Sequence, residues 1–260
     1  MLRRLAVVTA ALALLAPSVD AKADKDASTQ KKKNKNKKKS RWKKPSMKNI
    51  EKPADADQTP AHRYGMMSRE ACEAELTSRG VPFQPEEARG VYAPVRITGP
   101  IRGVTFRTNQ SEEKRATSRW EIADCRLVLA LDDFAEILAK HDIVDVRHYS
   151  MYRSPSKSWP EDKIGTRHNG AVAIDAARFI ASDGTYYDVL DHFSGRIDAK
   201  TCGPKAAPRK KSKQSLTLRA ILCDAVDAHL FNIVLTPNFN RAHRNHFHLE
   251  VTGAKWFLIH

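Results

Sequence analysis

The lysine-rich segment from residue 22 to residue 62 constrains the fold most, because it removes the N-terminal part of the chain from any folded core. Between residues 22 and 60 it has thirteen lysines and one arginine against five acidic residues. Its large apolar side chains are those of Trp42, Met47 and Ile50. So few apolar groups cannot offset the entropy lost on ordering. We therefore expect a disordered linker over residues 22–62 and a folded domain over residues 63–260.

Residues 1–21 have the pattern of a secretory signal peptide. A short basic start with Arg3 and Arg4 precedes an apolar run from Leu5 to Ala16. Val19 and Ala21 offer small residues at the −3 and −1 positions of a cleavage site after Ala21. The run is shorter than the ~20 residues that a membrane-spanning helix needs. We expect export, to the periplasm or the medium, with no transmembrane segment in the mature form. An uncleaved anchor is the alternative.

The positive charge of the linker predicts an anionic partner. The whole chain has a formal net charge of +15, and most of the excess lies in the linker. Such a charge promotes binding to anionic surfaces without specifying which one. Export favours anionic envelope polymers and makes nucleic acid an unexpected partner. A linker that only keeps the protein soluble is the other interpretation.

The four cysteines predict two disulfides. An even number of cysteines in an exported chain favours pairing, and the absence of a C-x-x-C spacing argues against a zinc ribbon. Three pairings are possible. We favour Cys72–Cys125 with Cys202–Cys223, because each bond joins neighbouring segments and leaves the central region free.

The order of the expected helices and strands is mixed. Helical periodicity or capping signals mark three ranges: 69–79, 126–140 and 216–230. Alternating or β-branched residues mark seven strands: 91–92, 95–97, 104–106, 143–149, 172–180, 231–236 and 247–251. This order predicts an α+β fold, with a small antiparallel sheet flanked by helices.

A cluster of histidines near the C-terminus is the strongest chemical signal. His243, His246 and His248 fall within six residues, and Phe247 begins an expected strand. Side chains alternate along a strand, so His246 and His248 project from the same face. Two imidazoles on one side suit a zinc ion. A cluster of surface histidines is the alternative.

A second signal is His168, followed seven positions later by Asp175 inside an apolar strand. A carboxylate in such a strand is costly to bury unless it is paired or bound to metal, and a bend at Gly170 would let both side chains reach one ion. Together with His248 they supply three zinc ligands. Three ligands leave a position open for water, which is typical of a catalytic rather than a structural zinc. A fourth ligand, His246, would close the site.

The two motifs together resemble a known family. His168-x6-Asp175 followed by His246-Phe247-His248 resembles the signature of the lysostaphin and D-Ala-D-Ala metallopeptidase superfamily. The closer resemblance is to the bacterial extensin-like C-terminal domain proteins, over roughly residues 72–251. It includes the stretches Tyr152-Arg153-Ser154 and Pro237-Asn238-Phe239-Asn240. The final histidine pattern is also similar to that of penicillin-insensitive murein endopeptidases.

The resemblance implies an exported zinc hydrolase of peptidoglycan peptide bonds, of endopeptidase or carboxypeptidase type. It implies that His168, Asp175 and His248 bind Zn²⁺, that His246 is catalytic, and that Arg153 contacts the substrate or the transition state. Two positions differ from many relatives. Ala171 stands where glycine is common, and Asn245 stands where an acid is common. An asparagine cannot act as a base, so the proton must go to His246 or His243. The alternative is a non-catalytic, extensin-like domain that binds the cell wall.

Overall fold

The computed structural model describes residues 50–160 and 164–260, which belong to one compact unit. The expected signal peptide and most of the expected linker lie outside the described residues. For residues 50–62 the expectation of disorder is wrong. Strand β1 (Ile50–Glu51) pairs with β11 (Phe257–Ile259), and helix α1 (Pro60–Gly65) begins within this stretch. Amino-acid composition does not predict this ordered structure, because the structure depends on backbone pairing at a sheet edge and on small buried side chains such as Ala61.

The main sheet has eight strands among the described residues, in the order β1-β11-β9-β10-β7-β6-β4, and β8 also pairs with β7. The bounds of the remaining strands are β4 Thr105–Arg107, β6 Ile143–His148, β7 Ala173–Ala181, β8 Tyr186–Asp188, β9 Ile233–Leu235 and β10 Phe247–Glu250. A second, three-stranded sheet contains β2 (Phe83–Pro85), β3 (Pro94–Ile97) and β5 (Ile122–Asp124).

The α+β class is confirmed, but the sheet is neither small nor wholly antiparallel. Strands β4 and β6 run parallel, as do β9 and β11. Parallel neighbours need a long crossover, and helix α4 (Cys125–Ala139) lies in the connection between β4 and β6. The strand expected at residues 91–92 is wrong, because Val91 instead closes a turn with Ala88.

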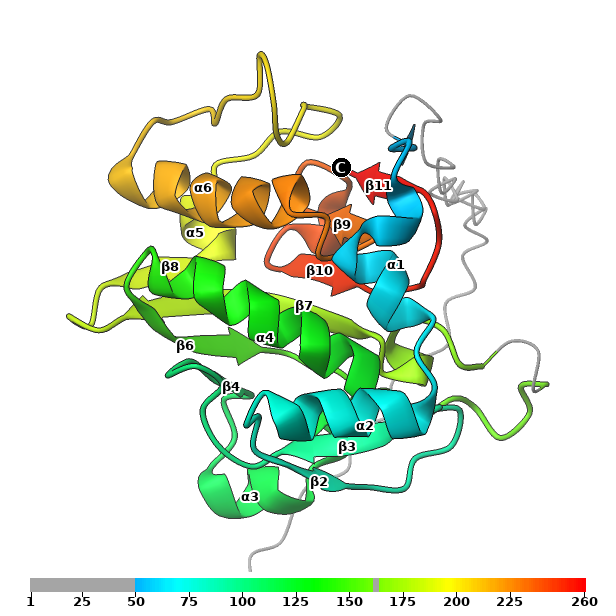
Figure 1. The fold of residues 1–260 in the computed structure, drawn as a ribbon. Coiled ribbons are helices and arrows are strands. Elements are labelled where there is room, and N and C mark those ends of the chain that lie inside the picture. The colour runs from blue at the N-terminus through cyan, green and yellow to red at the C-terminus, as the bar shows by residue number, and fades with distance from the viewer. Residues whose placement is uncertain (1–49, 161–163) are drawn as a thin grey trace, which may run out of the picture. The chain divides into compact units, whose positions relative to one another are not determined.

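The helices expected from periodicity form close to their expected ends, as α2 (Arg69–Ser78), α4 and α6 (Lys213–Asp227). Figure 1 shows α4 in front of β6 and β7, running in roughly the same direction as these strands, with α6 beside it. Shorter helices are α3 Glu112–Thr117 and α5 Val189–His192, and the 3₁₀ turns are η2 Ala56–Gln58, η3 Arg119–Glu121, η5 Arg167–Gly170 and η6 Arg241–His243. Among the residues with described positions, no helix is long and apolar enough to cross a bilayer.

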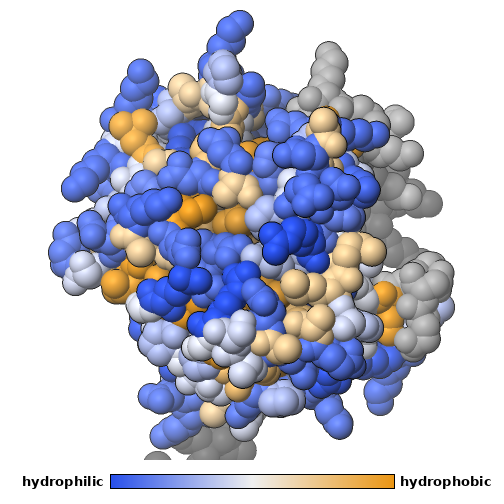
Figure 2. All heavy atoms as spheres, in the orientation of Figure 1, coloured by the Kyte–Doolittle hydropathy of each residue, from blue (hydrophilic) through white to orange (hydrophobic). Residues whose placement is uncertain are grey.

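The core determines which face of the sheet is free for chemistry. Ile174 and Ala176 of β7 belong to the main core with Phe247 and Leu249 of β10. Side chains alternate along a strand, so Asp175 and His248 point to the opposite face. The side of the molecule drawn in Figure 2, on which α4 lies in front of the sheet (Figure 1), is mostly hydrophilic with scattered apolar groups.

Both expected disulfides are confirmed. Cys72–Cys125 joins α2 to the first residue of α4, and Cys202–Cys223 joins a loop to α6. Disulfides persist in oxidising compartments, so the pairing indicates an environment of that kind.

Candidate metal centre

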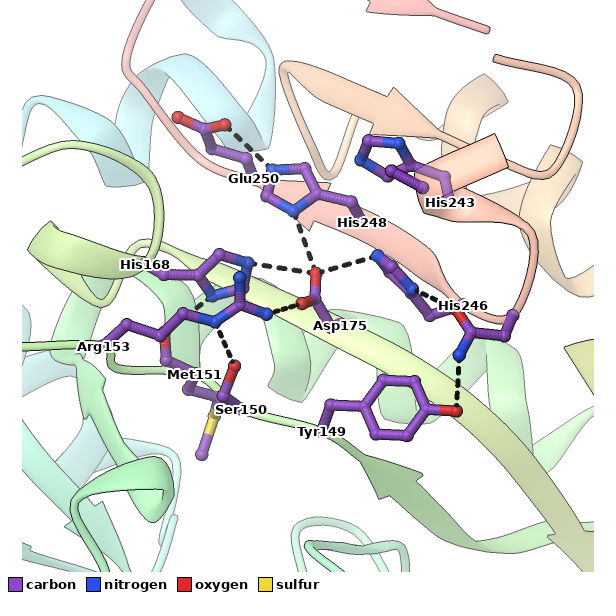
Figure 3. Close-up of polar contacts among 12 residues, drawn as sticks. Tyr149, Ser150, Met151, Arg153, His168, Asp175, His243, His246, His248 and Glu250 are labelled. Atoms are coloured by element: carbon purple, nitrogen blue, oxygen red, sulfur yellow. Dashed lines mark hydrogen bonds and ion pairs between the residues drawn. The ribbon is translucent and has the colours of Figure 1, made fainter. Parts of the chain in front are cut away.

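The pairing of β7 with β10 brings the first two site residues together. Asp175 and His248 are direct partners in the antiparallel ladder, so their side chains share a face. The His248 Nδ1 and Asp175 Oδ1 atoms lie 3.0 Å apart, and both side chains are buried. The sequence pattern predicts that both belong to one site, and the structure brings them together (Figure 3).

His168 reaches the same carboxylate from the 3₁₀ turn η5. Its Nε2 lies 3.0 Å from Asp175 Oδ1. The turn needs glycine at position 170, because a Cβ there would lie 2.3 Å from the backbone oxygen of Gly165. Ala171 then adopts a left-handed conformation with φ of 52°, which a glycine would adopt without steric cost. The bend expected at Gly170 is therefore confirmed.

His168, Asp175 and His248 form a buried group that can hold a metal ion. One donor atom from each lies within 4.8 Å of the others. The remaining ring nitrogens are already engaged: His168 Nδ1 lies 3.0 Å from the Met151 carbonyl oxygen, and His248 Nε2 lies 3.1 Å from Glu250 Oε2. Metal-binding histidines almost always donate their other ring N–H in this way. The donor set therefore fits a divalent metal.

Opposing influences act on the charges at this centre. Burial raises the pKa of Asp175, but hydrogen bonds from His168 and His248 outweigh it and hold that pKa far below its usual range. Burial lowers the pKa of His248, whereas Asp175 and Glu250 raise it to a net value above the ordinary one. Asp175 is therefore an anion at neutral pH, as a metal ligand must be.

His246 lies beside the three-residue group, as the strand alternation predicts. Its Nε2 is 3.4 Å from Asp175 Oδ1, and its Nδ1 is 3.0 Å from Asn245 Oδ1. His243 lies farther out on η6 and packs against the rings of His246 and His248, at centroid distances of 5.1 and 5.9 Å. Burial lowers the pKa of His246 to about 4 and that of His243 to about 3. Both imidazoles are therefore neutral at pH 7.

Arg153 reaches the site from the segment that follows β6. Its Nη2 forms an ion pair with Asp175 Oδ2, and its Nε donates to Ser150 Oγ at 2.9 Å. The side chain is 52% exposed, so part of the guanidinium faces solvent. The partner of Arg153 is therefore a residue of the candidate site, Asp175.

Sequence reasoning missed several residues that support this centre. The most important are Glu250, Met151, Ser150 and Tyr149. Only Glu250 had an available signal, because it follows His248 by two positions on a strand and must share its face. Met151 acts through its backbone carbonyl, and the hydroxyls of Ser150 and Tyr149 come from the segment after β6, which is distant in the sequence from Asp175.

Comparison with known proteins identifies the family. The model of the extensin-like protein C-terminus matches residues 70–257, which include every residue of the centre described above. No curated protein and no solved structure matches the chain. Because the match covers most of the chain, the protein belongs to the extensin-like C-terminal family.

Proposed function

We propose that this protein is an exported zinc peptidase that hydrolyses peptide bonds of peptidoglycan. The observation that carries the proposal is the convergence of His168, Asp175 and His248 on one buried point, with a neutral third imidazole, His246, beside them. The resemblance of the two motifs to the lysostaphin and D-Ala-D-Ala metallopeptidase superfamily supports the substrate class.

The donor set supports an open, catalytic site. Two nitrogen ligands and one oxygen ligand are typical of catalytic zinc, which keeps a fourth position for water. When bound, zinc supplies Lewis acidity and lowers the pKa of a coordinated water to about 7. His246 is not part of the three-residue donor group, which favours a role in proton transfer over a role as fourth ligand.

The chain's own residues divide the remaining work. His246 Nε2 faces the centre and can take a proton from the attacking water, then return it to the leaving amine. Arg153 uses Nε and Nη2 on Ser150 and Asp175. Its remaining N–H groups can hold a substrate carboxylate or a developing oxyanion. His243 packs against the ring of His246 and can orient the substrate.

The decisive experiment measures metal and turnover on one preparation. We expect about one zinc per chain in the purified protein, and its loss in His168→Ala, Asp175→Ala and His248→Ala, because an open site has only three protein ligands. Digestion of purified peptidoglycan should release peptide fragments, identified by mass, and a chelator should stop it. Full zinc occupancy in all three variants would contradict the assignment of these residues as zinc ligands.

Two further variants separate a base from a ligand. His246→Ala should keep zinc and lose activity by ~10²–10⁴, the usual contribution of a general acid or base. His141→Ala is the matched control, because this histidine pairs with Asp224, which lies on α6 away from the centre. Loss of zinc from His246→Ala would instead indicate a fourth ligand and a closed site.

A non-catalytic domain that binds the cell wall is the second candidate. Asn245, at a position where relatives often carry an acid, favours it, because an amide cannot act as a base. Zinc binding without any release of peptides would select this candidate. In either case the two disulfides support export, and the lysine-rich linker would bind anionic envelope polymers.

A further inference from the structure

A chain of three polar side chains leads from solvent into the metal centre. Asn245 Nδ2 donates to the Tyr149 hydroxyl at 2.9 Å, and Asn245 Oδ1 lies 3.0 Å from His246 Nδ1. The opposite ring nitrogen, His246 Nε2, faces Asp175 Oδ1 at 3.4 Å. Figure 3 shows Tyr149 and His246 on the same side of Asp175.

The asymmetry of the amide assigns the proton on the imidazole. An asparagine oxygen only accepts hydrogen bonds, and its NH₂ group only donates them. With the NH₂ group turned to Tyr149, the oxygen faces His246 Nδ1. That nitrogen must therefore carry the proton. In the neutral ring the lone pair is then on Nε2, which is the atom that faces the centre.

The position of Tyr149 is coupled to that of the metal ligand. The Tyr149 backbone N–H, directly after the end of β6, donates to the Asp175 carbonyl oxygen of β7 at 3.0 Å, so the backbone of Tyr149 is tied to that of the metal ligand. The Tyr149 ring also packs edge-on against His246, with centroids 5.9 Å apart. These two contacts fix the position of the Tyr149 hydroxyl, which orients Asn245, relative to the Asp175 carboxylate, which His246 faces.

We infer that Asn245 and Tyr149 are positioning residues that hold His246 as the Nδ1–H tautomer, with Nε2 as the base of the reaction. The inference rests on the proposed peptidase function. It also gives Asn245 a role. A carboxylate at this position could itself take the proton, whereas the amide cannot, so proton transfer falls to His246.

The test is the tautomer of His246 in the zinc-loaded, full mature protein. Long-range ¹H–¹⁵N spectra of histidine-labelled protein report which ring nitrogen is protonated, and the signal that disappears in His246→Ala identifies the residue. We expect the proton on Nδ1. A proton on Nε2 in the wild-type protein overturns the inference, whatever the activity.

Variants connect the tautomer to turnover. Asn245→Leu should lose the single tautomer, keep its zinc and lower kcat by ~10–100-fold with KM little changed, as expected for an outer hydrogen-bond partner. Asn245→Asp keeps an acceptor for His246 Nδ1 and, unlike Asn245→Leu, should keep the Nδ1–H tautomer. Tyr149→Phe should have a smaller effect than Asn245→Leu. A single Nδ1–H tautomer in Asn245→Leu, with unchanged kcat, would contradict the role of Asn245.

Matched controls lie outside the centre. Asn109 accepts from Arg147 at 3.3 Å, so Asn109→Leu removes a comparable amide. Tyr186→Phe removes a hydroxyl that donates to Asp188, and the two tyrosines are equally exposed at 42%. Neither control should change the tautomer. An Nδ1–H tautomer without any peptidoglycan hydrolysis would refute the proposed function while leaving the assignment of the proton intact.

Discussion

Glu250 is a buried carboxylate with a specific partner in the metal centre. It is 3% exposed, and its Oε2 lies 3.1 Å from His248 Nε2. A carboxylate so deeply buried is costly unless it is paired. Here it accepts the N–H of a ligand histidine, which fixes the orientation of the ring and makes the opposite nitrogen a better donor to a metal.

At the residue scale we predict that Glu250→Gln weakens zinc binding by about 10–100-fold, the usual cost of mutating an outer partner of a metal ligand. Glutamine can still accept from His248, so the ring orientation survives while the negative charge is lost. Competition with a chelating dye measures the affinity. Glu136→Gln is the control, because Glu136 is exposed and pairs with Arg102 away from the centre. Equal affinities for wild type and Glu250→Gln would contradict a role for Glu250.

The turn η5 and strand β7 form the element that carries two of the three ligands. His168 lies on the turn and Asp175 on the strand, and the close approach of Gly170 to Gly165 sets the path between them. The contact is with backbone atoms, so no flexible side chain can move aside to relieve it.

At the element scale we predict that Gly170→Ala displaces His168 and lowers zinc affinity. Gly80→Ala is the matched control: Gly80 has a φ of +68° at the end of α2, with nothing within 4 Å of an added Cβ. It should cost ~1–2 kcal/mol in stability, the usual penalty for a left-handed alanine, without changing zinc affinity. Zinc titration and urea unfolding of both variants check this. Unchanged zinc affinity in Gly170→Ala would count against the role of the turn.

The two disulfides act on the folded unit as a whole. Cys72–Cys125 closes a loop of 53 residues between α2 and α4, and Cys202–Cys223 closes one of 21 residues. A disulfide stabilises mainly by restricting the unfolded chain, and more so for longer loops. Neither bond includes a residue of the metal centre.

At the scale of the whole molecule we predict that the double variants Cys72→Ala/Cys125→Ala and Cys202→Ala/Cys223→Ala each lose ~2–5 kcal/mol of unfolding free energy. The loss should be larger for the first pair, by up to about 1 kcal/mol from the difference in loop length. Urea unfolding measures both, and each variant serves as the control for the other. A larger loss for Cys202→Ala/Cys223→Ala would show that strain or residual structure outweighs the loop-length effect.

The sequence alone determined the features that depend on local patterns. The caps and periodicity of α2 and α4 depend on contacts within a few residues, so their ends could be predicted closely. The period of two through Phe247, the first residue of β10, placed His246 and His248 on one side. The disulfide pairs followed from proximity along the chain.

Only the tertiary structure decided the features that depend on long-range pairing. The register of β7 with β10 sets the distance from Asp175 to His248. The ordered structure of residues 50–62 depends on the pairing of β1 with β11. Met151, the partner of His168, could not be identified from local patterns, because a hydrogen bond joins whichever groups folding brings within about 3 Å. Local periodicity determines which face a side chain occupies, whereas strand pairing determines which side chain it meets there.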